Sequence, residues 1–126
     1  MAYMLFMVEP VEQRSTRTPE EGRAVFQRMV DWGEDLKSRG LLLGVQSLSG
    51  TDSASRVQVR NGRARVVDGP FAEAKEMVGG FFLVDVDTRD EALALAAQCP
   101  AAEWCTVEVR SLAPCYDESK AVAATN

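Results

Sequence analysis

Two segments of this 126-residue chain are apolar on both of their alternating faces, and they constrain the fold more than any other feature. Residues 2–8 and 81–86 carry apolar side chains at successive positions, apart from Asp85. A strand with two apolar faces is covered on both of them. We therefore expect each segment to be a central strand of a sheet.

A helix and a further strand follow the first of these segments. Thr18, Pro19 and Glu21 form a capping-box pattern, with threonine at the N-cap, proline at the first helical position and glutamate at the third. Apolar residues then recur at helical spacing. Residues 41–48 are typical of a second strand. The first half of the chain is thus predicted to be β-α-β.

The second half repeats this order. Thr88 and Glu91 form another capping pattern, and Pro100 ends the helix that they begin. Residues 105–110 then alternate between apolar and polar, which is typical of an edge strand with one face in water. The second half is therefore also predicted to be β-α-β.

An insert separates the two halves. Residues 56–60 and 63–67 flank Asn61-Gly62, the strongest short-range signal for a β-hairpin. The stretch 68–80 is predicted to be irregular or to form a short helix. Gly79 and Gly80 within it would permit close backbone approach at the start of a central strand.

The predicted fold class is α+β, a ferredoxin-like β-α-β-β-α-β domain with a β-hairpin insert. The domain is expected to cover residues 1–112, and residues 113–126 to form a flexible tail. Two helices can cover only one face of a four-stranded sheet, and large exposed apolar patches usually mark an interface. We therefore expect a homodimer in which the two sheets pack face to face.

Composition excludes several classes of function. The net charge is −5, from 14 basic and 19 acidic residues, and no basic cluster appears, which argues against nucleic acid as a partner. No run approaches the ~20 apolar residues of a membrane span. The first eight residues lack the basic region of a signal peptide. Neither a membrane partner nor secretion is expected.

The cysteine and histidine counts indicate the cellular location and exclude further kinds of chemistry. Three cysteines, an odd number, and no secretion signal indicate reduced thiols and a cytoplasmic location. The chain contains no histidine, which excludes histidine-based catalysis and most catalytic zinc sites. We expect no cofactor and no metal.

Residues 67–76 form the segment richest in chemistry, Val-Asp-Gly-Pro-Phe-Ala-Glu-Ala-Lys-Glu. Asp68 is either a turn residue that accepts backbone N–H bonds or a general acid/base at the end of the sheet. Lys75 and Glu76, with Glu73, form either a solvated charged turn or a pair that leaves one carboxylate poised in a cleft. The candidate catalytic residues are Asp68, Lys75 and Glu76.

Four further residues are candidates for binding a ligand beside this segment. Phe71 is either a core residue or the wall of a pocket. Arg56 and Arg60 lie on one face of the predicted hairpin, because alternate side chains of a strand share a face. That face either meets solvent or contacts an anion. The candidate ligand-binding residues are Glu73, Phe71, Arg56 and Arg60.

The string DGPF-x-E-x-KE at 68–76, the glycine pair, the helix at 90–100 and Glu-Val-Arg at 108–110 resemble the YCII-related family, specifically its DGPF branch. The resemblance covers residues 2–112 and implies a dimeric α/β barrel of ferredoxin-like protomers. Wider relatives look like enzymes with a His–Asp pair, which a chain without histidine does not have. Members of the branch are often encoded beside extracytoplasmic-function sigma factors, which implies a functional link to such a factor.

Three functions remain open on the sequence alone. The first is a small-molecule-binding or regulatory module, and the second is a cofactor-independent enzyme acting on a small organic acid or cyclic substrate through Asp, Lys and Glu. The third is a purely structural interaction protein. An enzyme should place two ionisable groups on an enclosed cavity, a binder should show a cavity with one charge, and a structural protein should fill the space with side chains.

Overall fold

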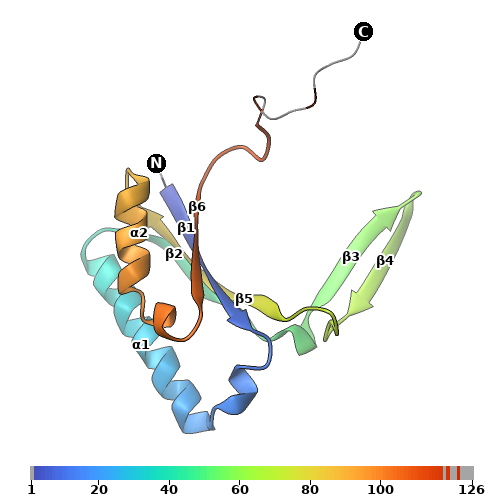
Figure 1. Cartoon of the computed structure of the whole chain (residues 1–126), viewed down its shortest axis with the longest axis horizontal. Coiled ribbons are helices and arrows are strands. Elements are labelled where there is room, and N and C mark those ends of the chain that lie inside the picture. The colour runs from blue at the N-terminus through green and yellow to red at the C-terminus, as the bar shows by residue number, and fades with distance from the viewer. Residues whose placement is uncertain (1, 118, 120–121, 123–126) are drawn as a thin grey trace.

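The computed structural model describes residues 2–117, 119 and 122. It is an α+β domain with two helices and six strands (Figure 1). In chain order its elements are β1 (Ala2–Pro10), α1 (Pro19–Ser38), β2 (Leu42–Ser47), β3 (Ser55–Arg60), β4 (Arg63–Asp68), β5 (Glu76–Asp85), α2 (Arg89–Gln98) and β6 (Thr106–Ser111), with 3-10 turns at Arg14–Thr16, Thr51–Ser53 and Pro100–Glu103. The predicted flexible tail lies partly outside the described residues.

Four of the strands form one antiparallel sheet in the order β2-β5-β1-β6. The central strands β1 and β5 are the two segments that are apolar on both faces, so the prediction of their place is confirmed. β5 begins at Glu76, earlier than the predicted strand 81–86. The glycine pair has low strand propensity on its own, but β1 and β2 both hydrogen-bond to this part of β5 and hold it in the sheet.

The predicted start of α1 is confirmed in detail. The Thr18 side chain accepts a hydrogen bond from the backbone N–H of Glu21, and the Glu21 carboxylate accepts one from the Thr18 N–H. At α2 only half of the predicted box forms. Thr88 accepts from the Glu91 N–H, while the Glu91 carboxylate accepts from the N–H of Asp87 instead.

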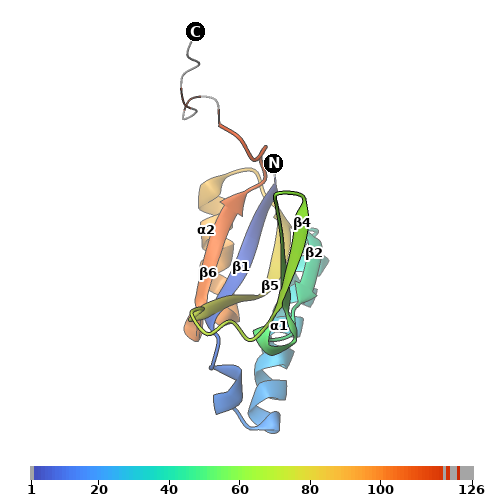
Figure 2. The same cartoon turned by 90° about the vertical axis from the view of Figure 1, so that its right-hand side faces the viewer.

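Both helices lie on the same face of the four-stranded sheet (Figures 1 and 2). The core forms where they meet it. Phe82 of β5 packs edge-to-face on Trp32 of α1, with ring centroids 4.8 Å apart. The other buried core residues are Tyr3, Leu5, Met7, Leu36, Val84, Val86, Ala92, Leu95, Ala96, Cys99 and Ala101.

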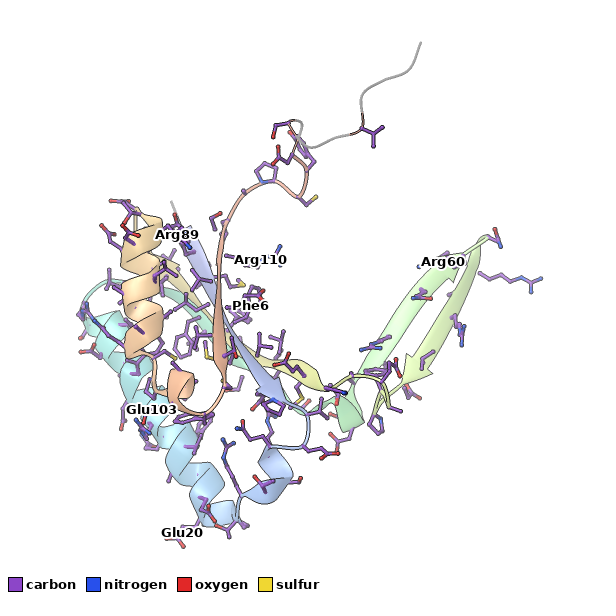
Figure 3. The ribbon with its side chains drawn as sticks, viewed as in Figure 1. Phe6, Glu20, Arg60, Arg89, Glu103 and Arg110 are labelled. Atoms are coloured by element: carbon purple, nitrogen blue, oxygen red, sulfur yellow. The ribbon has the colours of Figure 1, made fainter. Side chains whose placement is uncertain are left out.

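The opposite face of the sheet has no helix over it. Its centre is apolar and half-buried, and in Figure 3 Phe6 and Arg110 lie on this side, away from the helices. We call this surface the open face; its apolar residues are Met4, Phe6, Val8, Val78, Phe81 and Leu83. Phe82 does not belong to it, although the alternation of β5 alone leaves either phenylalanine possible. Of these two phenylalanines, Phe81 therefore contributes to the open face and Phe82 to the core.

The β3–β4 hairpin projects away from the sheet, on the side opposite to the helices (Figure 1). Asn61 and Gly62 turn it with positive φ angles of 53° and 74°, as the Asn-Gly signal predicts. Its register places most of its valines on one face and its arginines on the other. The arginine face carries Arg56, Arg60, Arg63 and Arg65, which confirms that the first two share a face.

Neither of the described helices combines the length and the apolarity that crossing a membrane requires.

Candidate functional site

A cavity of about 590 Å³ lies between α1 and the sheet. We call it the α1 cavity. Its helix side is a stripe at helical spacing, and its floor is the glycine-containing part of β5 together with the end of β2. The residues that line it include Glu9, Arg14, Arg17, Gly22, Phe26, Val30, Glu34, Leu48, Gly79, Trp104 and Cys105.

The cavity exists because the N-terminal half of α1 stands off the sheet. The buried residues of α1 are all in its C-terminal half, at Trp32, Gly33 and Leu36. One and two turns earlier, Val30 and Phe26 lie on the stripe that faces the cavity, yet they are 37% and 56% exposed. The sequence pattern predicts a helix whose whole apolar stripe is buried, so the unfilled half is a finding of the structure.

An ion pair between a buried carboxylate and a partly exposed guanidinium lies at the floor of this cavity. The Glu9 side chain, at the end of β1, is 8% exposed. Its Oε1 accepts hydrogen bonds from Arg14 Nε at 2.9 Å and from Nη2 at 2.6 Å. Arg14 also donates to the backbone oxygens of Leu48 at 2.8 Å and Gly79 at 3.3 Å. All three guanidinium nitrogens are therefore occupied, and the pair joins β1, β5 and the segment after β2.

Gly79 is required by this ion pair. A Cβ at position 79 would lie 2.0 Å from Glu9 Oε1 and 2.9 Å from Arg14 Nη2. At Gly80 a Cβ would lie 2.7 Å from the backbone oxygen of Gln46 in β2. The predicted close approach at the glycine pair is therefore confirmed, and its reason is the carboxylate and the neighbouring strand.

Trp104 forms another wall, near two arginines. The guanidinium carbons of Arg17 and Arg28 lie 5.9 and 5.3 Å from the centre of its ring, within the range of a cation–π contact. The Gln13 amide donates to the Trp104 backbone oxygen at 2.6 Å. Arg17 lines the cavity, whereas Arg28 does not and instead pairs with Glu103.

Cys105 also lines the cavity, and its thiol is unreactive there. Burial raises the pKa of Cys105 to about 11, and the charges of Glu9 and Cys99 add to the effect while Arg17 opposes it. Burial likewise raises the pKa of the Cys99 thiol. Because the thiolate is the nucleophile, a thiol with this pKa is protonated and inert at neutral pH.

The predicted catalytic residues lie elsewhere. Asp68 is exposed at the end of β4, where its Oδ1 accepts a hydrogen bond from Ser55 Oγ at 2.7 Å, across the base of the hairpin. Lys75 and Glu76 are exposed at the start of β5. The three side chains do not line the α1 cavity. Their catalytic roles stay predictions.

Three of the four predicted ligand-binding residues do come together. Arg56, Phe71 and Glu73 line a second pocket of about 340 Å³ at the base of the hairpin. The Arg56 guanidinium lies 3.7 Å from the centre of the Phe71 ring, and its Nη1 is 3.4 Å from Glu73 Oε1. Arg60 is at the hairpin tip, well away from this pocket (Figure 3). Their binding roles also stay predictions.

The Asp-Gly-Pro-Phe motif anchors the hairpin. The Gly69 N–H donates to the Ala54 oxygen at 2.7 Å, and a Cβ at Gly69 would lie 1.8 Å from the Thr51 backbone oxygen. Together with the Asp68–Ser55 bond, these contacts hold the base of the hairpin to the turn before it. Asp68 thus makes a cross-hairpin bond, rather than capping only its own turn.

Sequence reasoning missed Glu9, Arg14, Arg17 and Trp104 as site residues. One signal was available. Glu9 continues the alternation of Tyr3, Leu5 and Met7 and so falls on the core face of β1. Because carboxylates are almost never buried unpaired, a basic partner was to be expected nearby. Nothing in the sequence indicated that the partner would border a cavity.

In the described part of the chain, no group of three or more cysteine, aspartate or glutamate residues is arranged to hold a metal ion. The α1 cavity has apolar walls with a few polar groups, an arrangement typical of sites for small organic molecules.

The fold and cavity define a small α+β domain with a partly open site under its first helix. Residues 1–115 match the model of the YCII-related domain, and the chain belongs to this family. It is similar to an uncharacterized protein of Rhizobium meliloti (strain 1021), with 33% identity over 115 residues that cover 90% of this chain and 93% of the relative. Membership of the DGPF branch stays a prediction.

The substitution Gly79→Ala tests the contact between β5 and the ion pair. We expect it to lower the free energy of unfolding by about 1–3 kcal/mol, because the new methyl group displaces Glu9 and Arg14. Gly22→Ala, in α1, is the control, because a Cβ added there would meet nothing within 4 Å; it should stabilise the protein by about 0.5–1 kcal/mol. Urea denaturation measures both; equal effects of the two substitutions would contradict the account.

Cys105 should resist alkylation at pH 8, while the exposed Cys115 reacts. Iodoacetamide labelling with peptide mass spectrometry measures the two rates. Cys105 labelling should rise only as the pH approaches about 11, as the folded thiol ionises. The unfolded thiol ionises at a lower pH, so this group's contribution to stability is present at neutral pH and is lost as pH rises toward 11. Rapid labelling of Cys105 at pH 8 would contradict the assigned environment.

Proposed function

We propose that the protein binds a small, mostly apolar molecule in the α1 cavity. The observation that carries the proposal is a cavity of about 590 Å³ in which apolar side chains of α1 face the sheet without filling the space. Ligand cavities usually have volumes of roughly 300–1,000 Å³, apolar walls and a few fixed polar groups. A structural protein would fill this space, so the cavity argues for a ligand.

The polar groups favour binding over covalent catalysis. Glu9 and Arg14 neutralise one another, and Arg14 is further held by two backbone oxygens. The Cys105 thiol is protonated at neutral pH because its pKa is raised to about 11. These groups can orient a ligand, but they do not supply an activated nucleophile.

A cofactor-independent enzyme is the second candidate, and one observation favours it. Both hydrogen bonds from Arg14 reach Glu9 Oε1, and no described residue donates to Oε2. A carboxylate oxygen at the edge of an apolar cavity can accept a proton from a bound substrate. Turnover that is lost in Glu9→Gln while ligand affinity is kept would favour this candidate over simple binding.

We also propose that the protomer is ferredoxin-like and that two protomers pair through their open faces into a dimeric α/β barrel. The strand order supports this arrangement, because the two strands that are apolar on both faces are central in the sheet. An isolated two-stranded hairpin is marginally stable, and Val57 and Val66 of this one are more than 60% exposed. A partner would cover them together with the open face.

The fluorescent probe N-phenyl-1-naphthylamine tests the cavity, because it is neutral and emits strongly in apolar sites. We expect saturable binding of one probe per chain. Val30→Trp places a larger side chain in the cavity and should weaken binding at least about tenfold. Leu93→Trp, at a position of α2 that is as exposed as Val30 and does not line the cavity, is the control and should bind as wild type does. Equal affinity of Val30→Trp and wild type would place the probe elsewhere.

Sedimentation velocity tests the assembly. The wild-type protein should sediment as a dimer, and Phe6→Glu should give monomers or aggregates, because it places a charge at the centre of the open face. Leu93→Glu, at an exposed position of α2, is the control and should remain dimeric. A monodisperse wild-type monomer would rule out the proposed assembly.

A further inference from the structure

Two arginines line the α1 cavity, and their surroundings differ. Arg14 is neutralised by Glu9 and donates to two backbone oxygens. The Arg17 guanidinium makes no ion pair and no side-chain hydrogen bond with any residue that the structure describes. Arg17 is half-buried, so part of its hydration is lost without a described hydrogen-bond acceptor or carboxylate replacing it. Its charge is available to a molecule in the cavity.

A contact with Trp104 orients this charge without a ligand. The Arg17 guanidinium lies over the Trp104 ring at 5.9 Å. Trp104 is itself held by the Gln13 amide and by its own backbone N–H, which donates to the Ala101 oxygen at 3.1 Å. A side chain that is held in place before binding loses little freedom when a ligand arrives.

The carboxylates that line the cavity do not neutralise the charge of Arg17. The carboxylates that line it are Glu9, which Arg14 neutralises, and Glu34, which is exposed. Glu34 lies twelve residues beyond Gly22 on the same helix, or about 18 Å along its axis. Arg17 precedes the start of that helix. A single uncompensated positive charge therefore borders the end of the cavity near Trp104, and apolar walls strengthen its field.

We propose that the α1 cavity selects organic anions, namely carboxylic acids whose carboxylate pairs with Arg17 and whose apolar body lies beneath α1. A guanidinium offers parallel donors that match the two oxygens of a carboxylate. The inference rests on the proposed function and adds the chemical class of the ligand.

Two probes that share one ring system separate the charge from the apolar body. N-phenyl-1-naphthylamine is neutral, and 1-anilinonaphthalene-8-sulfonate is the same skeleton with an added anionic group. Wild-type protein should bind the anionic probe more tightly. Arg17→Met should lower the affinity for the anionic probe about tenfold or more and change that for the neutral probe less than about twofold.

Arg28→Met is the matched control, because Arg28 also lies over Trp104 but does not line the cavity. It should leave both affinities unchanged. Arg17→Lys keeps the charge and should retain most of the preference for the anionic probe. Displacement of the neutral probe by octanoate and by 1-octanol extends the test to carboxylates. Octanoate should displace it better in wild type, and Arg17→Met should abolish the difference.

The outcomes distinguish this inference from the function on which it rests. In one outcome the neutral probe binds, and wild type and Arg17→Met show the same preference for the anionic probe. This result overturns only the assignment of anion selectivity to Arg17. Equal loss of both probes in Arg17→Met overturns it too, because Arg17 would then support the cavity rather than select its ligand. Failure of the neutral probe to bind wild type contradicts the cavity function itself, and the inference with it.

Discussion

The ion pair between the buried Glu9 carboxylate and Arg14 is the interaction on which the site depends. It replaces water around a carboxylate on the core face of β1 with two guanidinium bonds. Through Arg14 it also joins the segment after β2 to β5, so three separate parts of the chain meet at one point. Such a contact leaves no room for a side chain at Gly79 in the polar floor of the α1 cavity.

The two ends of α1 contribute differently to the molecule. Its C-terminal half closes the core through Trp32 and Leu36, and this packing secures the helix to the sheet. Its N-terminal half is secured by the Thr18 capping box and by the loop that carries Arg14 and Arg17, with apolar side chains left facing the cavity. A helix anchored at one end and spaced from the sheet at the other can accommodate a ligand without losing the core.

Much of the fold could be predicted from local signals, because caps, hairpin turns and two-faced apolar strands are properties of a few adjacent residues. The start of α1 at Thr18 and the turn at Asn61-Gly62 are of this kind. Local signals could not predict whether Phe81 or Phe82 belongs to the core, because both faces of a central strand are apolar. That choice depends on which face the helices cover, a property of the whole chain.

The candidate site was harder to predict for a related reason. The charged segment near Asp68 stands out in the sequence, yet its described contacts hold the base of the hairpin together and to the turn before it. Glu9 and Arg17 lie near the start of the chain and Trp104 near its end, and they become a site only through the cavity that they border. The two tryptophans allow the most direct measurement of that claim, because Trp104 lines the cavity whereas Trp32 lies in the core beside it. In an NMR titration with octanoate, the indole N–H resonance of Trp104 should shift saturably and more than that of Trp32; saturable shifts confined to the hairpin, with both indole resonances unmoved, would contradict the account.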